Sequence, residues 1–148
     1  MKRSFLLLAL PLLLGAATPA SAQASANVSA TNPWMRYLLP NVPAGGYLTL
    51  HNNGGSPAEL TGANSPACGT LMLHKSENDS GMSMMVMVPS ITIPAHGEVS
   101  FAEGGYHLMC MKPDMKLGER IPVTLTFKDG ATLLLTMPVY GPAGPGNQ

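Results

Sequence analysis

Apolar and polar residues alternate in short runs along most of the chain, and clusters of glycine, proline, asparagine and serine separate these runs. After residue 22, apolar residues do not recur at the helical spacing of three and four residues over any long stretch. Short runs between turn-forming residues are typical of an antiparallel β-sandwich or barrel. The pattern therefore predicts an all-β fold built as a single domain.

The candidate strands are the segments rich in valine, leucine, threonine, tyrosine and methionine. They span residues 28–37, 46–51, 58–63, 70–76, 83–88, 91–93, 98–101, 105–111, 121–127 and 132–139. Turn-forming residues lie between them at 52–55, 79–81, 94–97 and 129–130. The last two of these turns are predicted to close hairpins. The tail over residues 141–148 has nothing to bury, so we expect it to be disordered.

The first 22 residues have the composition of a secretory signal peptide. A basic start over residues 1–3 precedes an apolar run over 5–14, and small residues follow as far as Ala22. The apolar run is shorter than the ~20 residues that span a bilayer, so stable membrane insertion is not expected. We expect cleavage after Ala22, export to the periplasm and a folded domain over residues 23–140. No cysteine stands at the cleavage point, so lipid attachment there is not expected.

Charge and composition argue against several classes of function. Without the signal peptide the chain keeps six Lys and Arg against eight Asp and Glu, a net charge of −2 with no basic cluster. Nucleic-acid binding needs a basic surface, so a nucleic-acid partner is not expected. A hydrolytic triad needs a nucleophile beside a histidine and a carboxylate, and the acidic residues form no such motif. We therefore expect a protein that is not an enzyme.

The two cysteines of the chain are Cys68 and Cys110. In an exported protein an even number of cysteines suggests a disulfide, because the destination is oxidising. Two separate thiols, one of them a metal ligand, are the alternative. The sequence therefore predicts a possible Cys68–Cys110 disulfide.

Methionine is unusually frequent in the second half of the chain. Eight of the eleven methionines lie between Met72 and Met115. Core filling accounts for any single methionine, since this side chain packs into irregular gaps. The segment 82–87, however, places methionine on both faces of one predicted strand, which specifies packing poorly. At least one of these side chains is expected to face something other than the core.

Two short motifs bring histidine and methionine together. His107 and Met109 are two residues apart on a predicted strand, so their side chains project to the same face. His74 ends another apolar run, and a methionine returns after the predicted turn at 79–81. Four methionines are candidates for this returning position: Met82, Met84, Met85 and Met87. If the two hairpins lie side by side, they form a site of two nitrogens and two sulfurs.

Such a donor set selects a metal. Thioether sulfur is soft and uncharged, so it favours Cu(I) over Zn(II), Mg(II) or Ca(II). Thioethers bind without losing a proton and do not form disulfides, which suits an oxidising compartment. Neutral ligands also favour capture and release over permanent retention. The other two histidines, His51 and His96, border predicted turns and are expected at the surface.

The spacing His74, ten residues, Met85, twenty-one residues, His107, one residue, Met109 resembles the signature of the PCu(A)C family of periplasmic copper chaperones. The resemblance covers nearly all of residues 27–140. Its matching flanks are 45–50, 93–95, 104–109 and 123–127. It implies a cupredoxin-like β-sandwich, an exposed Cu(I) site with Met85 as the hairpin ligand, and delivery of copper toward the dinuclear copper centre of a haem-copper terminal oxidase.

Several alternatives remain open. The copper-accepting partner could be an oxidase subunit or another metallochaperone. In another reading the protein has no such partner and only sequesters copper for tolerance. A disulfide-bonded assembly module with incidental methionines would bind no copper.

Two other kinds of copper site are not expected. A blue-copper electron carrier needs a histidine shortly after its cysteine ligand, and no histidine follows Cys110. Some relatives carry a second copper site in a tail rich in histidine and methionine, but this tail has neither residue.

Overall fold

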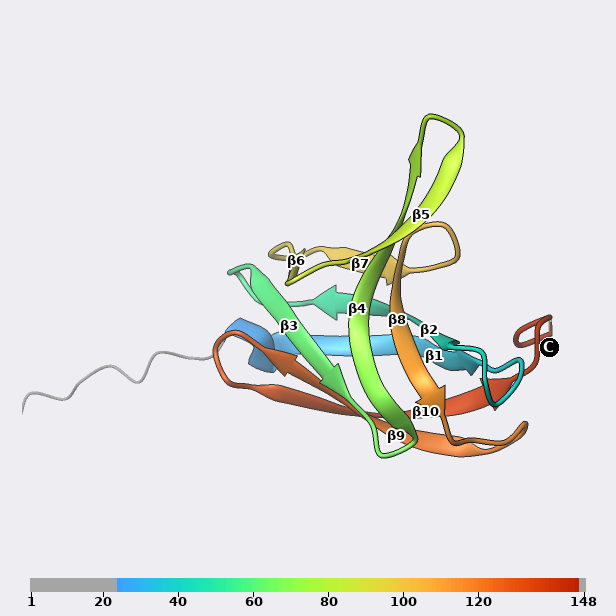
Figure 1. The fold of residues 1–148 in the computed structure, drawn as a ribbon. Helices are drawn as coiled ribbons and strands as arrows, with labels where there is room; N and C mark the ends of the chain where they lie inside the picture. Colours follow the sequence, from blue (N-terminus) through green and yellow to red (C-terminus); the bar gives the residue numbers. More distant parts are fainter. Residues whose placement is uncertain (1–23, 147–148) are drawn as a thin grey trace, which may run out of the picture.

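The computed structural model describes residues 24–146, and the predicted signal peptide at 1–22 lies outside the described residues. Figure 1 shows a fold of β-strands preceded by one short 3-10 helix, η1 (Ala24–Asn27). The strands are β1 (Val28–Arg36), β2 (Ala44–Asn52), β3 (Ala58–Asn64), β4 (Cys68–Asp79), β5 (Met82–Met87), β6 (Ile91–Ile93), β7 (Glu98–Phe101), β8 (Tyr106–Pro113), β9 (Arg120–Phe127) and β10 (Thr132–Tyr140). In this part of the chain no helix is long and apolar enough to cross a membrane.

The strands hydrogen-bond in the order β5-β4-β8-β2-β1-β10-β9-β3-β6, and β7 pairs with β2. This order confirms the predicted all-β sandwich. Among the pairs formed by residues 24–146, one is parallel: β1 and β10 lie side by side (Figure 1), with Met35 opposite Val139 and Arg36 opposite Tyr140. The parallel pair joins the layer that contains β4, β8 and β2 to the layer that contains β9, β3 and β6. Alternation of apolar residues along a strand does not reveal such a pairing.

The core lies between the two layers. Its largest fully buried side chains include Met35, Leu50, Leu60, Ile93, Leu108, Leu125, Phe127 and Met137. They come from alternate positions of their strands, because successive side chains of a strand point to opposite faces. Cys68 at the start of β4 and Cys110 in β8 form a disulfide, and Cys110 is fully buried.

The hairpin of β4 and β5 projects beyond the rest of the molecule (Figure 1). Asp79 pairs with Met82, so Ser80 and Gly81 form a two-residue turn, with positive φ angles of 51° and 83°. These angles match the type I′ turn that suits the twist of a hairpin. β4 is longer than the predicted strand at 70–76, because its ladder with β5 continues through polar residues up to Asp79.

The predicted hairpin at residues 94–97 is wrong. The turn is present, with Gly97 N donating to Pro94 O at 3.1 Å, but it connects strands that pair with different neighbours. β6 pairs with β3 and β7 pairs with β2. Turn residues reverse the chain without fixing which strands then pair, and here the reversal carries the chain from one layer to the other.

The tail begins with a turn in the part that the structure describes. Gly144 N donates to Gly141 O at 3.0 Å, which closes a turn over residues 141–144. A Cβ atom at Gly144 would lie 2.9 Å from the Trp34 ring, and its φ is 70°. Glycine therefore lets the backbone lie against an aromatic side chain, and Trp34 supplies the apolar surface that the tail lacks.

Candidate metal centre

The predicted ligands lie on three neighbouring strands. β5, β4 and β8 are adjacent in the sheet, and His74 pairs with His107 on one side and with Met87 on the other. Sequence reasoning expected two separate hairpins that come together. The structure instead forms one continuous ladder, so hydrogen-bonded register places His74 directly beside His107.

The residue pairs next to this histidine pair in the β5-β4-β8 ladder include the two predicted sulfur ligands. Met85 of β5 pairs with Ser76, and Met109 of β8 pairs with Met72. Paired residues of an antiparallel ladder share a face, and so do residues two apart on one strand. His74, Met85, His107 and Met109 therefore all project from the same face of the β5-β4-β8 ladder.

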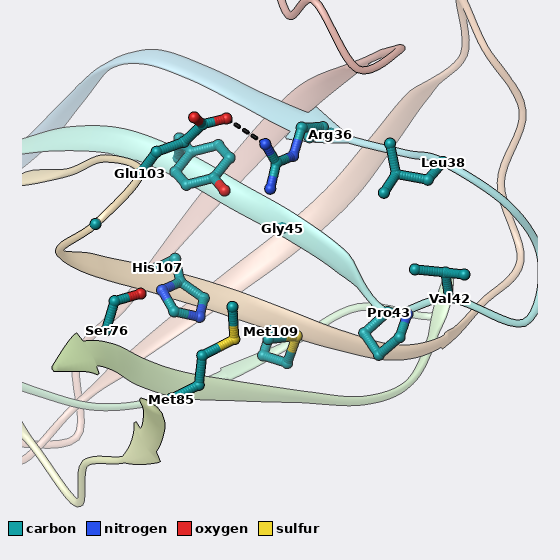
Figure 2. Close-up of a pocket in the computed structure, with 12 residues that line it drawn as sticks. Arg36, Leu38, Val42, Pro43, Gly45, Ser76, Met85, Glu103, His107 and Met109 are labelled. Carbon is teal, nitrogen blue, oxygen red and sulfur yellow. Dashed lines mark hydrogen bonds and ion pairs between the residues drawn. The ribbon is translucent and has the colours of Figure 1, made fainter. Parts of the chain in front are cut away.

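A cavity of about 340 Å³ opens on this face. Met85, His107 and Met109 line it together with Ser76, and Figure 2 shows both thioethers beside the His107 ring. His74 is not among the lining residues, but the centroid of its ring is 5.7 Å from that of His107. The structure thus brings three of the four predicted ligands to one cavity and places the fourth next to them.

Two ring nitrogens near this cavity lack hydrogen-bond partners. His107 Nδ1 donates to Gly105 O at 3.2 Å, so in the neutral ring Nε2 keeps its lone pair. His107 Nε2 and His74 Nδ1 are both buried, and neither has a hydrogen-bond partner within residues 24–146. A buried polar atom without a partner is costly unless a ligand satisfies it. The two atoms therefore indicate a place where a metal ion or another ligand binds.

The local electrostatics favour a neutral His74. Burial lowers the pKa of His74 below its usual value, and the neighbouring His107 ring lowers it further. A neutral imidazole offers a lone pair to a metal without first losing a proton. This ligand is therefore ready to bind near neutral pH.

The wall of the cavity opposite the thioethers carries an ion pair. The Arg36 guanidinium donates to the Glu103 carboxylate, as Figure 2 shows, and lies 5.7 Å from the centre of the Tyr47 ring. Burial raises the pKa of the Tyr47 phenol, although the Arg36 charge acts in the opposite direction. The carboxylate is thus held by an arginine and the phenol stays protonated. The soft and imidazole donors that line the cavity are His107, Met85 and Met109, and none of them is part of this ion pair.

This donor set fits a soft ion. Within residues 24–146, no three side chains of His, Cys, Asp or Glu cluster in a way that could hold a metal. Zinc, calcium and magnesium sites are built from those residues, whereas two imidazoles with two thioethers suit Cu(I). The residues present therefore fit copper in its reduced state.

Known proteins are similar to this chain over most of its length. A family model described as "Putative lipoprotein LpqE-like" matches residues 28–139, most of the chain. The chain belongs to the LpqE-like family. The Leifsonia xyli subsp. xyli protein Lxx21020, which carries the same lipoprotein description, is 33% identical over 128 residues, covering 82% of this chain and 76% of the relative.

Solved structures similar to this LpqE-like protein include copper proteins. Cu(I)-bound DR1885 of Deinococcus radiodurans is 32% identical, with a TM-score of 0.62 over 85% of this chain and 89% of that one. The copper-bound PCuAC domain of PmoF2 has a TM-score of 0.65 over 78% of this chain and 94% of that one, at 21% identity. The resemblance to PCu(A)C domains that the motif indicated is thus confirmed in the fold.

The other two histidines of this LpqE-like chain lie away from the cavity. His51 Nε2 is 2.8 Å from Thr31 Oγ1, and His51 Nδ1 is 3.0 Å from a Glu98 carboxylate oxygen. His96 is exposed at the turn between β6 and β7. Both rings therefore differ from His74 and His107, each of which has one buried ring nitrogen without a partner within residues 24–146.

Several residues near the site were missed by sequence reasoning. Met72 shares the ligand face, and the signal was present, because it is two residues from His74 on the same strand. Met87, one of the four candidates for the hairpin ligand, lies on this face as well. Arg36, Tyr47 and Glu103 reach the cavity from β1, β2 and the segment before β8. No short motif links these three residues, so only the fold could reveal them.

Proposed function

We propose that this protein binds one Cu(I) ion through His74, Met85, His107 and Met109 and transfers it to a copper-accepting protein. The observation that carries the proposal is the pair of buried ring nitrogens without partners on a face that also presents two thioethers. An ion bound there would satisfy both nitrogens at once. The Cu(I)-bound relative, which is 32% identical, supports the same cargo.

Transfer fits the site better than storage. Met85 is 59% exposed on a projecting hairpin, so a partner can approach one ligand directly. All four proposed ligands are neutral, and thioethers are replaced by other soft ligands without any proton transfer. The protein would therefore receive and release copper by ligand exchange, as a metallochaperone and not as an enzyme.

The proposed cellular setting is the periplasm. The family model and the Leifsonia relative are described as lipoproteins, which supports a place in the cell envelope, and the predicted signal peptide supports the periplasm. The resemblance to periplasmic copper chaperones points to the dinuclear copper centre of a haem-copper oxidase as the recipient. Incubating the Cu(I)-loaded protein with a copper-free soluble oxidase domain, then separating the two, tests this recipient by where the copper is found.

The copper site itself is tested by competition with a chromophoric Cu(I) chelator. Ascorbate serves as the reductant in place of a thiol, so that the disulfide stays intact. We expect one tight Cu(I) equivalent for the native protein. The His107→Ala, Met109→Leu double variant should bind at least roughly tenfold more weakly, since even groups outside the first coordination shell cost that much when removed.

A matched control uses the same residue types away from the cavity. His96→Asn keeps a residue that tolerates the positive φ of 52° at this turn, and Met84→Leu changes an exposed methionine on the other face of the hairpin. This control variant should keep native affinity. An absence of Cu(I) binding by the native protein would discard the proposal, and a disulfide-bonded assembly module would then describe the chain better.

A further inference from the structure

A second hollow lies along β4, next to the part of the strand that carries His74. A groove of about 280 Å³ between β3 and β4 is lined by Met72 and Met87, among others. Along β4, Ser76 lines the first cavity and Met72 lines the groove, and His74 stands between them. Along β5, Met85 lines the first cavity and Met87 lines the groove. Each hollow thus has two thioethers, and His74, which lines neither hollow, stands along β4 between the residues that line the one and the other.

The register places the groove methionines close to His74. Met87 pairs directly with His74 across the β4-β5 ladder, and the Cβ atoms of such pairs lie about 4.5 to 5.5 Å apart. Met72 precedes His74 by two residues on the same strand and therefore shares its face. Met85 pairs with Ser76, so it is only a diagonal neighbour of His74. By register alone, Met87 is the better placed of the two β5 sulfurs for this imidazole.

Packing does not explain Met87. Its side chain is 67% exposed, so it does not serve as a core residue. Met82 and Met84 are also exposed, but they pair with Asp79 and Glu77 and project from the opposite face of the hairpin. Exposure is therefore common to these methionines, and only the face distinguishes Met87. Its face is the one that carries the imidazole of His74.

We propose that Met72 and Met87 form, together with His74, a second Cu(I) ligand set that the ion occupies during capture or release. The proposal rests on the Cu(I) site proposed above and adds a second position to it. In the exchange the bonds from copper to His107, Met85 and Met109 break, and bonds to Met72 and Met87 form while His74 stays bound. Copper remains Cu(I), and no electron or proton moves.

The shared histidine makes the two positions alternatives. Because a neutral imidazole has one lone pair, His74 binds a single ion, and the native protein should take up one tight equivalent and not two. Each position has one exposed thioether, Met85 at 59% and Met87 at 67%, but only the first position also uses the ring of His107, which is 4% exposed. An ion held at the second position would be more accessible to a partner.

The test isolates the second ligand set. In the His107→Ala, Met109→Leu background, Cu(I) titration against a weak chromophoric chelator should reveal one remaining equivalent, weaker than that of the native protein. Adding Met72→Leu and Met87→Leu should lower this remaining affinity at least roughly tenfold. Methionine and leucine have similar volumes, so the fold should survive, and circular dichroism checks that it does.

Two control variants test whether the remaining binding comes from the second ligand set or from other methionines of the hairpin. Met82→Leu with Met84→Leu in the same background removes two exposed methionines from the other face and should leave the remaining affinity unchanged. Met85→Leu in that background asks whether the first cavity accounts for the remaining binding. The inference is overturned if the remaining binding depends on Met85 alone, or if the background variant binds no Cu(I) although the native protein does.

A direct readout comes from the methyl resonances of the methionines. In the background variant, Cu(I) should shift the Cε-methyl signals of Met72 and Met87 and leave those of Met82 and Met84 in place. Shifts confined to Met85 would contradict the second ligand set. Failure of the native protein to bind Cu(I) at all would instead contradict the proposed function, so the two failures are distinguishable.

Discussion

Strands β4 and β8 carry different kinds of side chain on their two faces. The inner face is buried and apolar: Leu71, Leu73, Leu108 and Cys110. The outer face of the same two strands carries the soft donors: Met72, His74, His107 and Met109. Both sets are spaced two residues apart, so strand alternation alone separates the core from the candidate metal centre.

The two faces also differ in whether their buried groups have packing or hydrogen-bond partners. The inner face packs against the other layer and is tied by the Cys68–Cys110 disulfide. On the outer face, His74 Nδ1 and His107 Nε2 are buried without partners in the described part of the chain. An arrangement that lowers stability is expected where a site binds a ligand. The inner face therefore holds the fold together, and the outer face gives up some stability for binding.

Removal of the disulfide should produce the largest loss of stability. Cys68 and Cys110 are separated by 42 residues, and closing a loop of this length restricts the unfolded chain. The loop-entropy model gives about 4 kcal/mol for it. The Cys68→Ala, Cys110→Ala variant should lose about this much free energy of unfolding, measured with urea, while Cu(I) affinity below the transition changes little. A large loss of Cu(I) affinity in a folded variant would contradict the assignment of stability to the inner face and of binding to the outer face.

Truncation in the core should have the next largest effect. Leu108 follows His107 and precedes Met109 in the sequence, but its side chain points to the inner face and is fully buried. Leu108→Ala should therefore lower the free energy of unfolding by about 3 kcal/mol, through lost burial and the cavity left behind. Leu134→Ala is the control, because that side chain is 72% exposed and should change stability little. Equal effects of the two changes in urea unfolding would contradict the assignment of the inner face as core.

Much of the fold follows from the sequence, because strand alternation and turn residues are local signals. The segments 91–93 and 98–101 match β6 and β7 in full, since turn residues bound both. Pairing between distant strands is not local, so the parallel β1–β10 pair and the path between layers at 94–97 did not follow from the pattern. The turn of the tail depends on Trp34, far away in the chain.

The candidate site was predictable to a similar degree. The shared face of His107 and Met109 follows from their spacing of two residues. The choice of Met85 among the hairpin methionines came from the family resemblance, and register would by itself favour Met87 as the partner of His74. The direct pairing of His74 with His107 needed the order of strands in the sheet. Local patterns thus give the donors, and the fold gives their arrangement.

Replacement of a ligand by an apolar residue should change stability and Cu(I) binding in opposite directions. In His107→Leu the buried Nε2 without a partner is removed, and Gly105 O still accepts from Ser76 N at 3.0 Å. We expect the metal-free variant to gain about 1 kcal/mol in free energy of unfolding, the lower end of the cost of such an atom. Its Cu(I) affinity should fall at least roughly tenfold. Lower stability in urea would show that His107 supports the fold.

The smallest effect on stability is expected on β5, where neither face is buried. Met84 and Met85 are 49% and 59% exposed and point to opposite faces, so leucine at either position should change the free energy of unfolding by less than about 0.5 kcal/mol. Chelator competition should nevertheless separate them. Met85→Leu removes a sulfur from the cavity that His107 and Met109 line and should weaken Cu(I) binding, whereas Met84→Leu should not. If both variants bind as the native protein does, the ligand face ends at β4 and the hairpin contributes no sulfur from position 85.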